Sequence, residues 1–360
     1  MLTAQRGLGN GIMCDSMNLR IPFSMEFHMK IASCISLVAL AILTGCGGGG
    51  GGSSANTPVT ITAANYEEIA ESGLDSVLSA GALAGDTSNT TGSILGGVEV
   101  GPAKRVGLAK LALNMARYSL AKVPSSPAVA VVGAVTSFSE SCDVSGTFSG
   151  SATLQVAGSY TVGDNISVTF SQCNDGESVF SGSMAIRIDA FEGDPLNDNL
   201  GRFAFTITLQ NFLADGSTID GSMSIDSTQT LTINSLDVGI PSLSIIAASE
   251  RSSFSNFELS IESNSVANTS SFEMMGTFYS LEIGGSLTFS TTTPVVMNNN
   301  DGTITSGVIV ITGANNGKIR VSSNGTNRPL VETDVNGDGV FELNSRLSSS
   351  ESFGDVVGSL

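Results

Sequence analysis

The chain has 360 residues and a formal net charge of −18, from 33 acidic and 15 basic side chains. This acidic balance argues against nucleic acid as a partner, because phosphate binding needs clustered Lys and Arg. The hydrophobic fraction of 41% is sufficient for a packed core and argues against a wholly disordered chain.

The first patterned segment is an apolar run near the N-terminus. Residues Ile31–Leu43 directly follow Met29-Lys30. The run has the length of a signal-peptide core and is too short to span a bilayer as a helix, which takes roughly 20 apolar residues. Residues 1–28 lack the features of a basic signal start, so we expect them to be an over-called extension, with Met29 or Met25 as the true initiator.

Small residues and a single cysteine follow this run as Leu43-Thr44-Gly45-Cys46. Together, Met29–Cys46 resembles the signal peptide and lipobox of bacterial lipoproteins. The resemblance implies removal of residues 29–45, a diacylglycerol on the Cys46 thiol, and a fatty acid such as palmitate on the new amine. Gly47 rather than Asp follows the anchor, which by the same resemblance favours the outer membrane of a Gram-negative bacterium. The alternatives are an ordinary secretory signal cut elsewhere and a buried helix.

Residues 46–58 are rich in Gly and Ser and predict a flexible tether between anchor and body. Cleavage before Cys46 would leave 12 basic and 31 acidic residues and would remove the only histidine, His28. Without His, Ser-His-Asp and Cys-His nucleophile systems are excluded. Because the remaining cysteines form no cluster either, ordinary zinc sites are also excluded. We therefore expect a protein that is not an enzyme, with a hydrolase that uses paired carboxylates as the alternative.

Residues 59–140 predict two helices joined by loops, after a short strand over Val59–Thr62. Asn65 is the expected N-cap of the first helix, and the second helix opens at Pro102 and reaches Lys122. The basic residues of the second helix indicate either contact with anionic lipid or packing against the acidic β domain, and we favour packing. These residues are Lys104, Arg105, Lys110, Arg117 and Lys122.

In residues 141–347 the apolar residues recur at every second position, as in Ile166-Val168-Phe170 and Phe203-Phe205-Ile207. Alternation of apolar and polar residues is typical of antiparallel strands with one wet face. We expect a mainly β fold, an antiparallel meander of about ten to thirteen strands that forms a curved sheet, a barrel or a sandwich. The two N-terminal helices should pack on this sheet, and residues 348–360 should form a flexible C-terminal tail.

Cys142 and Cys173 are the two cysteines without another assigned role. Exported chains usually bridge such an even pair, so we expect a disulfide, with two free buried thiols as the alternative. If Cys142 begins one strand and Cys173 ends its antiparallel partner, the bridge clamps the open end of a hairpin. The far end of that hairpin would then lie in Ala157–Asn165.

The segment Asp334–Gly339 matches the first half of a calcium-binding loop. Position 12 of the loop is Ser345 instead of Glu, and the flanking residues 330–333 and 340–343 predict strands, so no EF-hand is expected. The alternative, which we favour, is a β-hairpin turn in which glycine supplies the positive φ. If calcium binds, it should be a weak, structural cofactor. The candidate ligands are Asp334, Asn336, Asp338, the carbonyl of Val340, and Glu342.

The sequence therefore predicts a membrane-anchored lipoprotein with a structural or interaction role. Its expected partners are the membrane, through Cys46, and either an unidentified protein or an apolar ligand. The alternative function is a carrier of lipid or another apolar ligand in a β barrel or half-barrel. That alternative rests on architectural analogy only.

Overall fold

The computed structural model describes part of the chain, and its two compact units are Met1–Gly52 and Ser53–Leu360. Several predicted segments lie outside the described residues. They are the predicted extension 1–28, the predicted signal peptide 29–45, most of the predicted tether 46–58 and the predicted tail 348–360. The described residues all belong to the second unit and comprise 57–74, 98–99, 105–106, 108–122, 134–156, 160–176, 178–194, 200–247, 250–300, 303–323 and 329–346.

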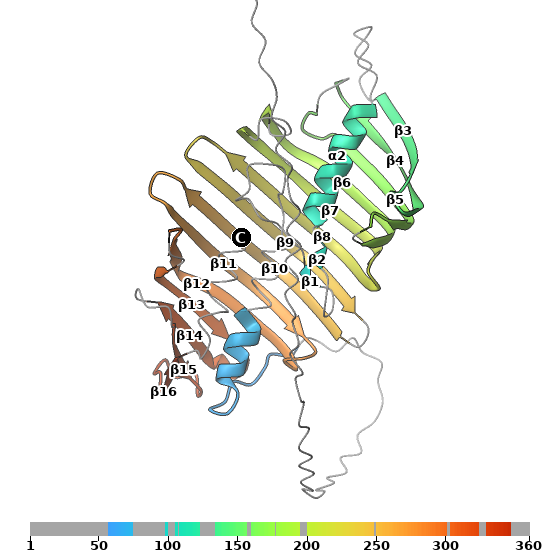
Figure 1. Ribbon diagram of the computed structural model, residues 1–360. Helices are drawn as coiled ribbons and strands as arrows, with labels where there is room; N and C mark the ends of the chain where they lie inside the picture. The colour runs from blue at the N-terminus through green and yellow to red at the C-terminus, as the bar shows by residue number, and fades with distance from the viewer. Residues whose placement is uncertain are drawn as a thin grey trace, which may run out of the picture. The chain divides into compact units, whose positions relative to one another are not determined.

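One antiparallel sheet of 14 strands dominates the described chain (Figure 1). The order of the strands in the sheet is their order in the sequence, so the sheet is a meander, as predicted. It begins at Ala134, earlier than the expected boundary at residue 141. The strands are β3 (Ala134–Ser141), β4 (Ser145–Leu154), β5 (Asn165–Asn174), β6 (Val179–Asp194), β7 (Leu200–Ala214), β8 (Ser217–Gln229), β9 (Ile233–Ala247), β10 (Glu250–Asn264), β11 (Thr269–Ser280), β12 (Gly285–Asn298), β13 (Ile304–Thr312), β14 (Lys318–Ser323), β15 (Leu330–Asp334) and β16 (Leu343–Arg346).

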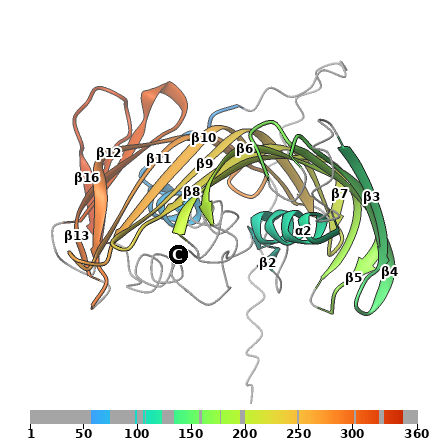
Figure 2. The same cartoon turned by 90° about the horizontal axis from the view of Figure 1, so that it is seen from above.

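The sheet curves strongly but does not close (Figure 2). β3 and β16 are its two edges and do not pair with each other, so the expectation of a barrel or sandwich is wrong and that of a curved sheet is right. Wide sheets accumulate twist and curl, and register shifts between most of the central strands add bends. Helices cover the concave face, so closure into a barrel is not needed to bury it.

Alternation along the strands separates the two faces of the sheet. In β5, Ile166, Val168 and Phe170 are buried, whereas the intervening Ser167 and Thr169 are exposed. The buried side chains of successive strands join one hydrophobic core on the concave side. The outer face carries the polar side chains. This is the pattern expected of strands with one wet face.

Two helices lie against the concave side, α2 (Leu108–Lys122) and a helix that includes residues 66–74 (Figure 2). In α2, Leu108, Ala112 and Ala116 are fully buried at helical spacing. Both helices precede the sheet in sequence, as predicted, but they lie within the chain rather than at its N-terminus. α2 begins at Leu108 rather than Pro102, because the preceding residues form a short ribbon of β1 (Val98–Glu99) and β2 (Arg105–Val106).

The start of the first helix also departs from the expected capping. Asn65 occupies the N-cap position, and its backbone carbonyl accepts the N–H of Ile69 at 2.9 Å. Its side chain, however, turns backward and accepts the N–H of Thr62 at 2.7 Å. The side chain therefore closes the preceding turn instead of capping the helix.

A buried polar contact ties α2 to the loop between β4 and β5. The hydroxyl of Tyr160 donates to the carbonyl of Ala116 at 2.5 Å and lies 2.6 Å from the Ser119 hydroxyl. Burial raises the pKa of Tyr160 to about 12, because the apolar surroundings disfavour the charged phenolate. The packing of α2 on the sheet agrees with the favoured interpretation, that this helix packs against the β domain. The basic side chains of its segment lie outside the described ones, so they do not decide between lipid and protein contact.

Residues Val59–Thr62 do not form the expected strand. Just before them, Pro58 makes an isolated parallel bridge with Ser286, at the first residues of β12. In the part of the chain with described structure, no helix is long and apolar enough to cross a bilayer.

Candidate functional site

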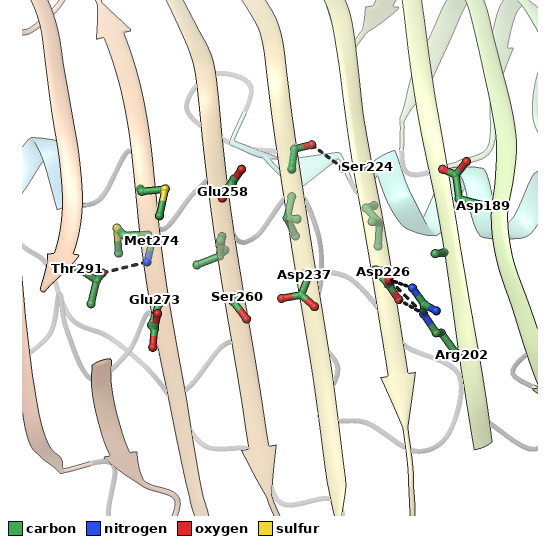
Figure 3. A pocket seen from close by; sticks show the side chains of 16 residues that line it. Asp189, Arg202, Ser224, Asp226, Asp237, Glu258, Ser260, Glu273, Met274 and Thr291 are labelled. Carbon is green, nitrogen blue, oxygen red and sulfur yellow. Dashed lines mark hydrogen bonds and ion pairs between the residues drawn. The ribbon is translucent and has the colours of Figure 1, made fainter. Parts of the chain in front are cut away.

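The outer face of the sheet carries a polar groove across β6–β12 with a volume of about 450 Å³ (Figure 3). Each of the neighbouring strands β6–β11 contributes one charged side chain to the lining. These side chains lie on the face of the sheet opposite to α2. Their sequence neighbours, such as Ile225 and Val238, point into the core, because successive side chains of a strand alternate between faces. The charged residues are Asp189, Arg202, Asp226, Asp237, Glu258 and Glu273.

Strand register places several of these carboxylates in one row across the sheet. Asp226 pairs with Asp237 between β8 and β9. The row continues from Asp237 to Ser260 on β10 and from Ser260 to Glu273 on β11. Neighbouring strands are about 4.8 Å apart, and like charges directly opposite each other destabilise a sheet. The fold therefore tolerates a repulsion that a polar, uncharged row would avoid.

Arg202 on β7 neutralises one end of this row. Its Nε lies 3.0 Å from Oδ1 of Asp226, and its Nη2 lies 2.6 Å from Oδ2, which makes a two-pronged ion pair. The hydrogen bond and the charge of Asp226 raise the pKa of Arg202 above its already high value. Among the described residues, Asp237, Glu258 and Glu273 have no ion-pair partner.

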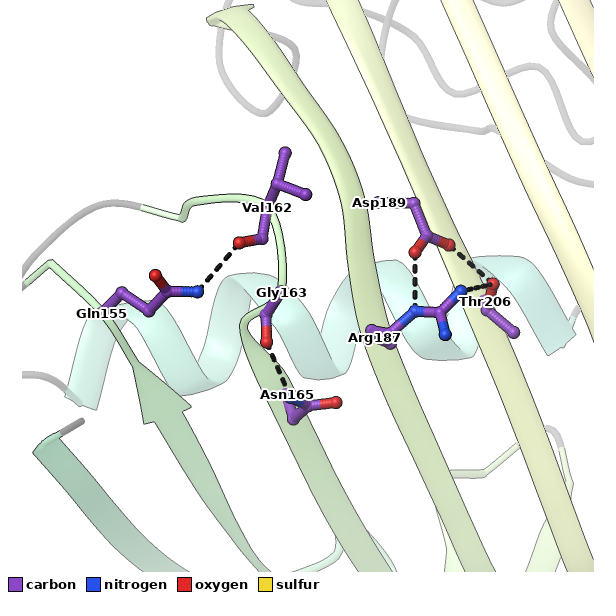
Figure 4. A network of polar contacts seen from close by, with 7 residues as sticks. All are labelled: Gln155, Val162, Gly163, Asn165, Arg187, Asp189 and Thr206. Carbon is purple, nitrogen blue, oxygen red and sulfur yellow. Dashed lines mark hydrogen bonds and ion pairs between the residues drawn. The ribbon is translucent and has the colours of Figure 1, made fainter.

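A second polar network borders the groove on β6 and β7 (Figure 4). Nε of Arg187 donates to Oδ1 of Asp189 at 2.7 Å, and the hydroxyl of Thr206 donates to Oδ2 of the same carboxylate at 2.6 Å. The hydrogen bond between Arg187 and Asp189 and the charge of Asp189 raise the pKa of Arg187. Asp189 is thus satisfied within the sheet, so the negative charge available to a partner is concentrated on β9–β11.

The arrangement suits cation binding better than catalysis. The paired-carboxylate alternative requires two acidic side chains that face a substrate in a cleft. Asp226 and Asp237 are such neighbours, but both oxygens of Asp226 are already engaged by the guanidinium of Arg202. The remaining carboxylates are spread over a shallow sheet face, which can meet ammonium or guanidinium groups of a partner.

The structure brings together three of the predicted calcium ligands. One carboxylate oxygen from each of Asp334, Asp338 and Glu342 lies within 4.8 Å of the other two. Asn336 is nearby, but its Oδ1 accepts the N–H of Asp338 and its Nδ2 donates to Glu342. Val340 is exposed, and its N–H donates to Asp338 at 2.8 Å. The carboxylates of Asp334, Asp338 and Glu342 are thus the candidate ligands that the structure places close together.

The hydrogen bonds of this loop favour the hairpin-turn interpretation. Asp334 is fully buried, and its two oxygens accept the N–H groups of Gly337 at 2.7 Å and Gly339 at 2.8 Å. Both glycines have positive φ, as the turn interpretation predicts. The loop is longer than a tight turn, because the second strand, β16, begins at Leu343 rather than at residue 340. The buried carboxylate is satisfied by the chain itself.

The predicted disulfide is present, with Cys142 bonded to Cys173. Cys142 precedes β4, and Cys173 lies near the end of β5, which pairs with β4 in antiparallel register. The connection between these strands covers residues 155–164, close to the predicted far end of the hairpin. The bridge therefore clamps the open end of the hairpin, as expected. The lipidation candidate Cys46 lies outside the described residues.

The acidic row was not identified from the sequence. Its members are isolated Asp and Glu residues in separate strands, and none belongs to a motif. Only the register shows that Asp226 faces Asp237. A usable signal existed in each strand, since these residues occupy outward positions of the alternating pattern.

Neither a protein-family model, nor a curated protein, nor a solved structure matches the chain.

Proposed function

We propose that the chain is a bacterial lipoprotein, fastened to the outer membrane through acylated Cys46, whose folded body has a non-enzymatic interaction role. The observation that carries this proposal is the sequence Leu43-Thr44-Gly45-Cys46 after a short apolar run. Each buried methylene contributes about 0.8 kcal/mol, so two or three acyl chains make attachment effectively permanent. The glycine-rich segment after Cys46 supplies a tether.

The disulfide agrees with an exported location. Cys142 and Cys173 bridge two neighbouring strands of the body. Such bonds persist in oxidising compartments and are rare in the bacterial cytosol. A bridge in the folded body is therefore consistent with a protein that has crossed the inner membrane.

The outer face is the part of the body best suited to a protein partner. Asp237, Glu258 and Glu273 line the groove there without an ion-pair partner in the described chain. Asp237 also lies directly opposite the carboxylate of Asp226. Like charges in this position cost stability, and proteins keep such local conflicts mainly where function needs them. The matching partner is a protein surface rich in Lys or Arg. Salt should weaken this contact, because exposed charges are screened.

Detergent phase separation of cell extracts tests the anchor. The parent should enter the detergent phase, whereas Cys46→Ser should remain in the aqueous phase because it has no acyl chain. Cys34→Ser is the matched control, since it changes a cysteine of the apolar run that cleavage would remove. A parent that stays in the aqueous phase overturns the proposal.

A second candidate function is the carriage of an apolar ligand. The observation in its favour is the curved, open sheet with an apolar concave face beneath two helices (Figure 2). The groove across β6–β12 on the outer face is lined by six charged side chains, so the apolar ligand would have to bind on the concave side. Mass spectrometry of an organic extract of the purified protein tests the carrier role. Stoichiometric lipid beyond the acyl anchor supports it, and its absence argues against it.

A further inference from the structure

The open sheet has two edges, which differ in length and in protection (Figure 1). At one edge, β16 has four residues, and so short a strand offers little to a partner strand. At the other edge, β3 has eight residues, contains no Lys, Arg or Pro, and pairs with β4 without a register shift. β3 therefore lacks most of the devices that protect exposed edges from pairing with another strand.

The register of β3 with β4 shows which of its backbone groups point outward. The N–H of Cys142 donates to the carbonyl of Gly146 at 3.1 Å, so these two residues form a hydrogen-bonded pair. The pair continues the uninterrupted register of β3 with β4. Hydrogen-bonded and non-hydrogen-bonded pairs alternate along an antiparallel ladder, so the N–H and carbonyl groups of every second residue of β3 point away from β4. These residues are Val135, Ser137, Ser139 and Ser141.

The outward groups of β3 are available for pairing. In the described part of the chain, no strand lies beyond β3, and no hydrogen bond reaches the outward groups of these residues. Their side chains are all exposed, and three of them are serines, which are too small to shield the backbone. The disulfide between Cys142 and Cys173 fixes the end of the strand, so little order has to be gained on binding. Such an edge is a template for one further strand.

We propose that β3 is a dimerisation edge, and that its partner is β3 of a second copy of this chain, in antiparallel register around Phe138. The inference goes beyond the proposed function and holds whether or not Cys46 is acylated. Two copies joined in this way share one continuous antiparallel sheet. The contact is isologous, because the same strand serves on both sides of a twofold axis.

One register satisfies the whole edge. With the twofold axis at Phe138, Ser137 faces Ser139 of the second copy, and Val135 faces Ser141 of the second copy. Both pairs are of the hydrogen-bonded kind, so every outward N–H and carbonyl group of β3 finds a partner. Moving the axis by one residue in either direction leaves Val135 or Ser141 without a partner in the opposite β3. The backbone therefore selects the register centred on Phe138.

The side chains agree with this register. Glu140, the only charged residue of β3, faces Thr136 of the second copy, so no like charges lie directly opposite each other. Phe138 faces its own copy in a non-hydrogen-bonded pair, where side chains approach most closely and aromatic pairs are favourable. Its ring is held in place by Tyr118 and Phe148, with centroids 5.5 Å and 6.3 Å away. The strand is thus complementary to itself.

Net charge and size set the strength of the dimer. A pair of eight-residue strands is a small interface, so the dimer should be weak in dilute solution. Each chain carries a formal charge of −18, so two copies repel each other. Salt should therefore strengthen the dimer by screening this repulsion. The effect is opposite to that expected for a basic partner of the acidic groove, so salt distinguishes the two contacts.

Sedimentation equilibrium of the full chain carrying Cys46→Ser tests the dimer. Ser137→Asp/Ser139→Asp places carboxylates opposite each other across the axis, whereas Ser137→Asp/Ser139→Lys places Asp opposite Lys at the same exposed positions. The dissociation constant should be at least about fivefold higher for the Asp/Asp variant than for the Asp/Lys variant.

Ser137→Lys/Ser139→Lys is the control for net charge. It should weaken the dimer as Asp/Asp does, although it lowers the negative charge of the chain. Equal dissociation constants in the Asp/Asp and Asp/Lys variants overturn the proposal. A parent that stays monomeric at every concentration also overturns it and leaves the edge to a strand of another protein.

Disulfide crosslinking tests the register. Thr136 and Glu140 of the second copy form a non-hydrogen-bonded pair, with Cβ atoms about 4.5–5.5 Å apart. In the Cys46→Ser background, an equimolar mixture of Thr136→Cys and Glu140→Cys proteins should form a mixed disulfide dimer under oxidised glutathione. Each variant alone should not crosslink, because its two cysteines would lie about 13 Å apart along the strands. A single variant that crosslinks as well as the mixture, or a mixture that does not crosslink, overturns the register and the proposal with it.

Discussion

Asp226 on β8 and Asp237 on β9 are direct cross-strand partners on the outer face, and Arg202 forms its ion pair with Asp226. Asp237→Asn removes the repulsion between the two carboxylates without changing the size of the side chain. The free energy of unfolding should therefore rise by a few tenths of a kcal/mol. Urea unfolding at low and high salt measures the change in unfolding free energy. The change should be smaller at high salt, because salt screens the repulsion between Asp226 and Asp237 in the parent.

Glu262→Gln is the control for this substitution. Glu262 is exposed on β10, where its partners are Ser235 and Ser271 rather than a carboxylate. It should leave stability nearly unchanged. The prediction is contradicted if Asp237→Asn lowers the unfolding free energy, or if both variants change it equally. Repulsion between Asp226 and Asp237 would then not destabilise the sheet.

Because of the contact between Tyr160 and α2, the free energy of unfolding should vary with pH in the alkaline range. The phenol of Tyr160 titrates at about 12 in the folded protein and at about 10 when unfolded. Its stabilising contribution is complete below pH 10 and is lost as the pH rises through 12. Tyr160→Phe should cost about 1–2 kcal/mol at neutral pH and flatten the decline between pH 10 and 12. Tyr279→Phe is the control, and an unchanged alkaline decline in Tyr160→Phe contradicts the assignment.

The bridge between Cys142 and Cys173 should contribute substantially to stability. It joins residues separated by 31 positions, and closing a loop of that length stabilises a fold by about 3–4 kcal/mol in the chain-entropy model. The double variant Cys142→Ser/Cys173→Ser should lose about this amount in urea unfolding. A reducing agent should reproduce the loss in the parent and have no effect on the double variant. A parent that is insensitive to reduction would contradict the bridge.

The loop 335–342 should fold without calcium. Both oxygens of buried Asp334 accept backbone N–H groups, so Asp334→Asn should cost about 1–3 kcal/mol with no metal present. Asp338→Asn should be nearly neutral, because Asp338 is exposed. Calorimetric titration with millimolar calcium should give no saturable heat. Saturable heat that Asp338→Asn abolishes would establish the calcium interpretation instead.

Local patterns predicted much of the fold. Alternation of apolar and polar residues identified the strands, and helical spacing identified α2, because both signals depend on near neighbours in the sequence. The calcium-like loop was likewise recognisable, since all its candidate ligands lie within Asp334–Glu342. The hairpin clamped by Cys142 and Cys173 followed from the even pair of cysteines and the alternating pattern between them.

Features that depend on long-range register were not predictable. Whether a meander closes depends on shear and on what covers its concave face, and neither is encoded in one strand. The acidic row needs the pairing of Asp226 with Asp237, which a shift of one residue would destroy. The bridge between Pro58 and Ser286 joins segments that are far apart in the sequence and share no motif.

Metabolic labelling with palmitate tests the lipid anchor most directly. The parent and Cys34→Ser should both incorporate label into the mature protein, and Cys46→Ser should incorporate none. A parent without label, or equal label in Cys46→Ser, would contradict an acylated Cys46 and with it the membrane-bound role.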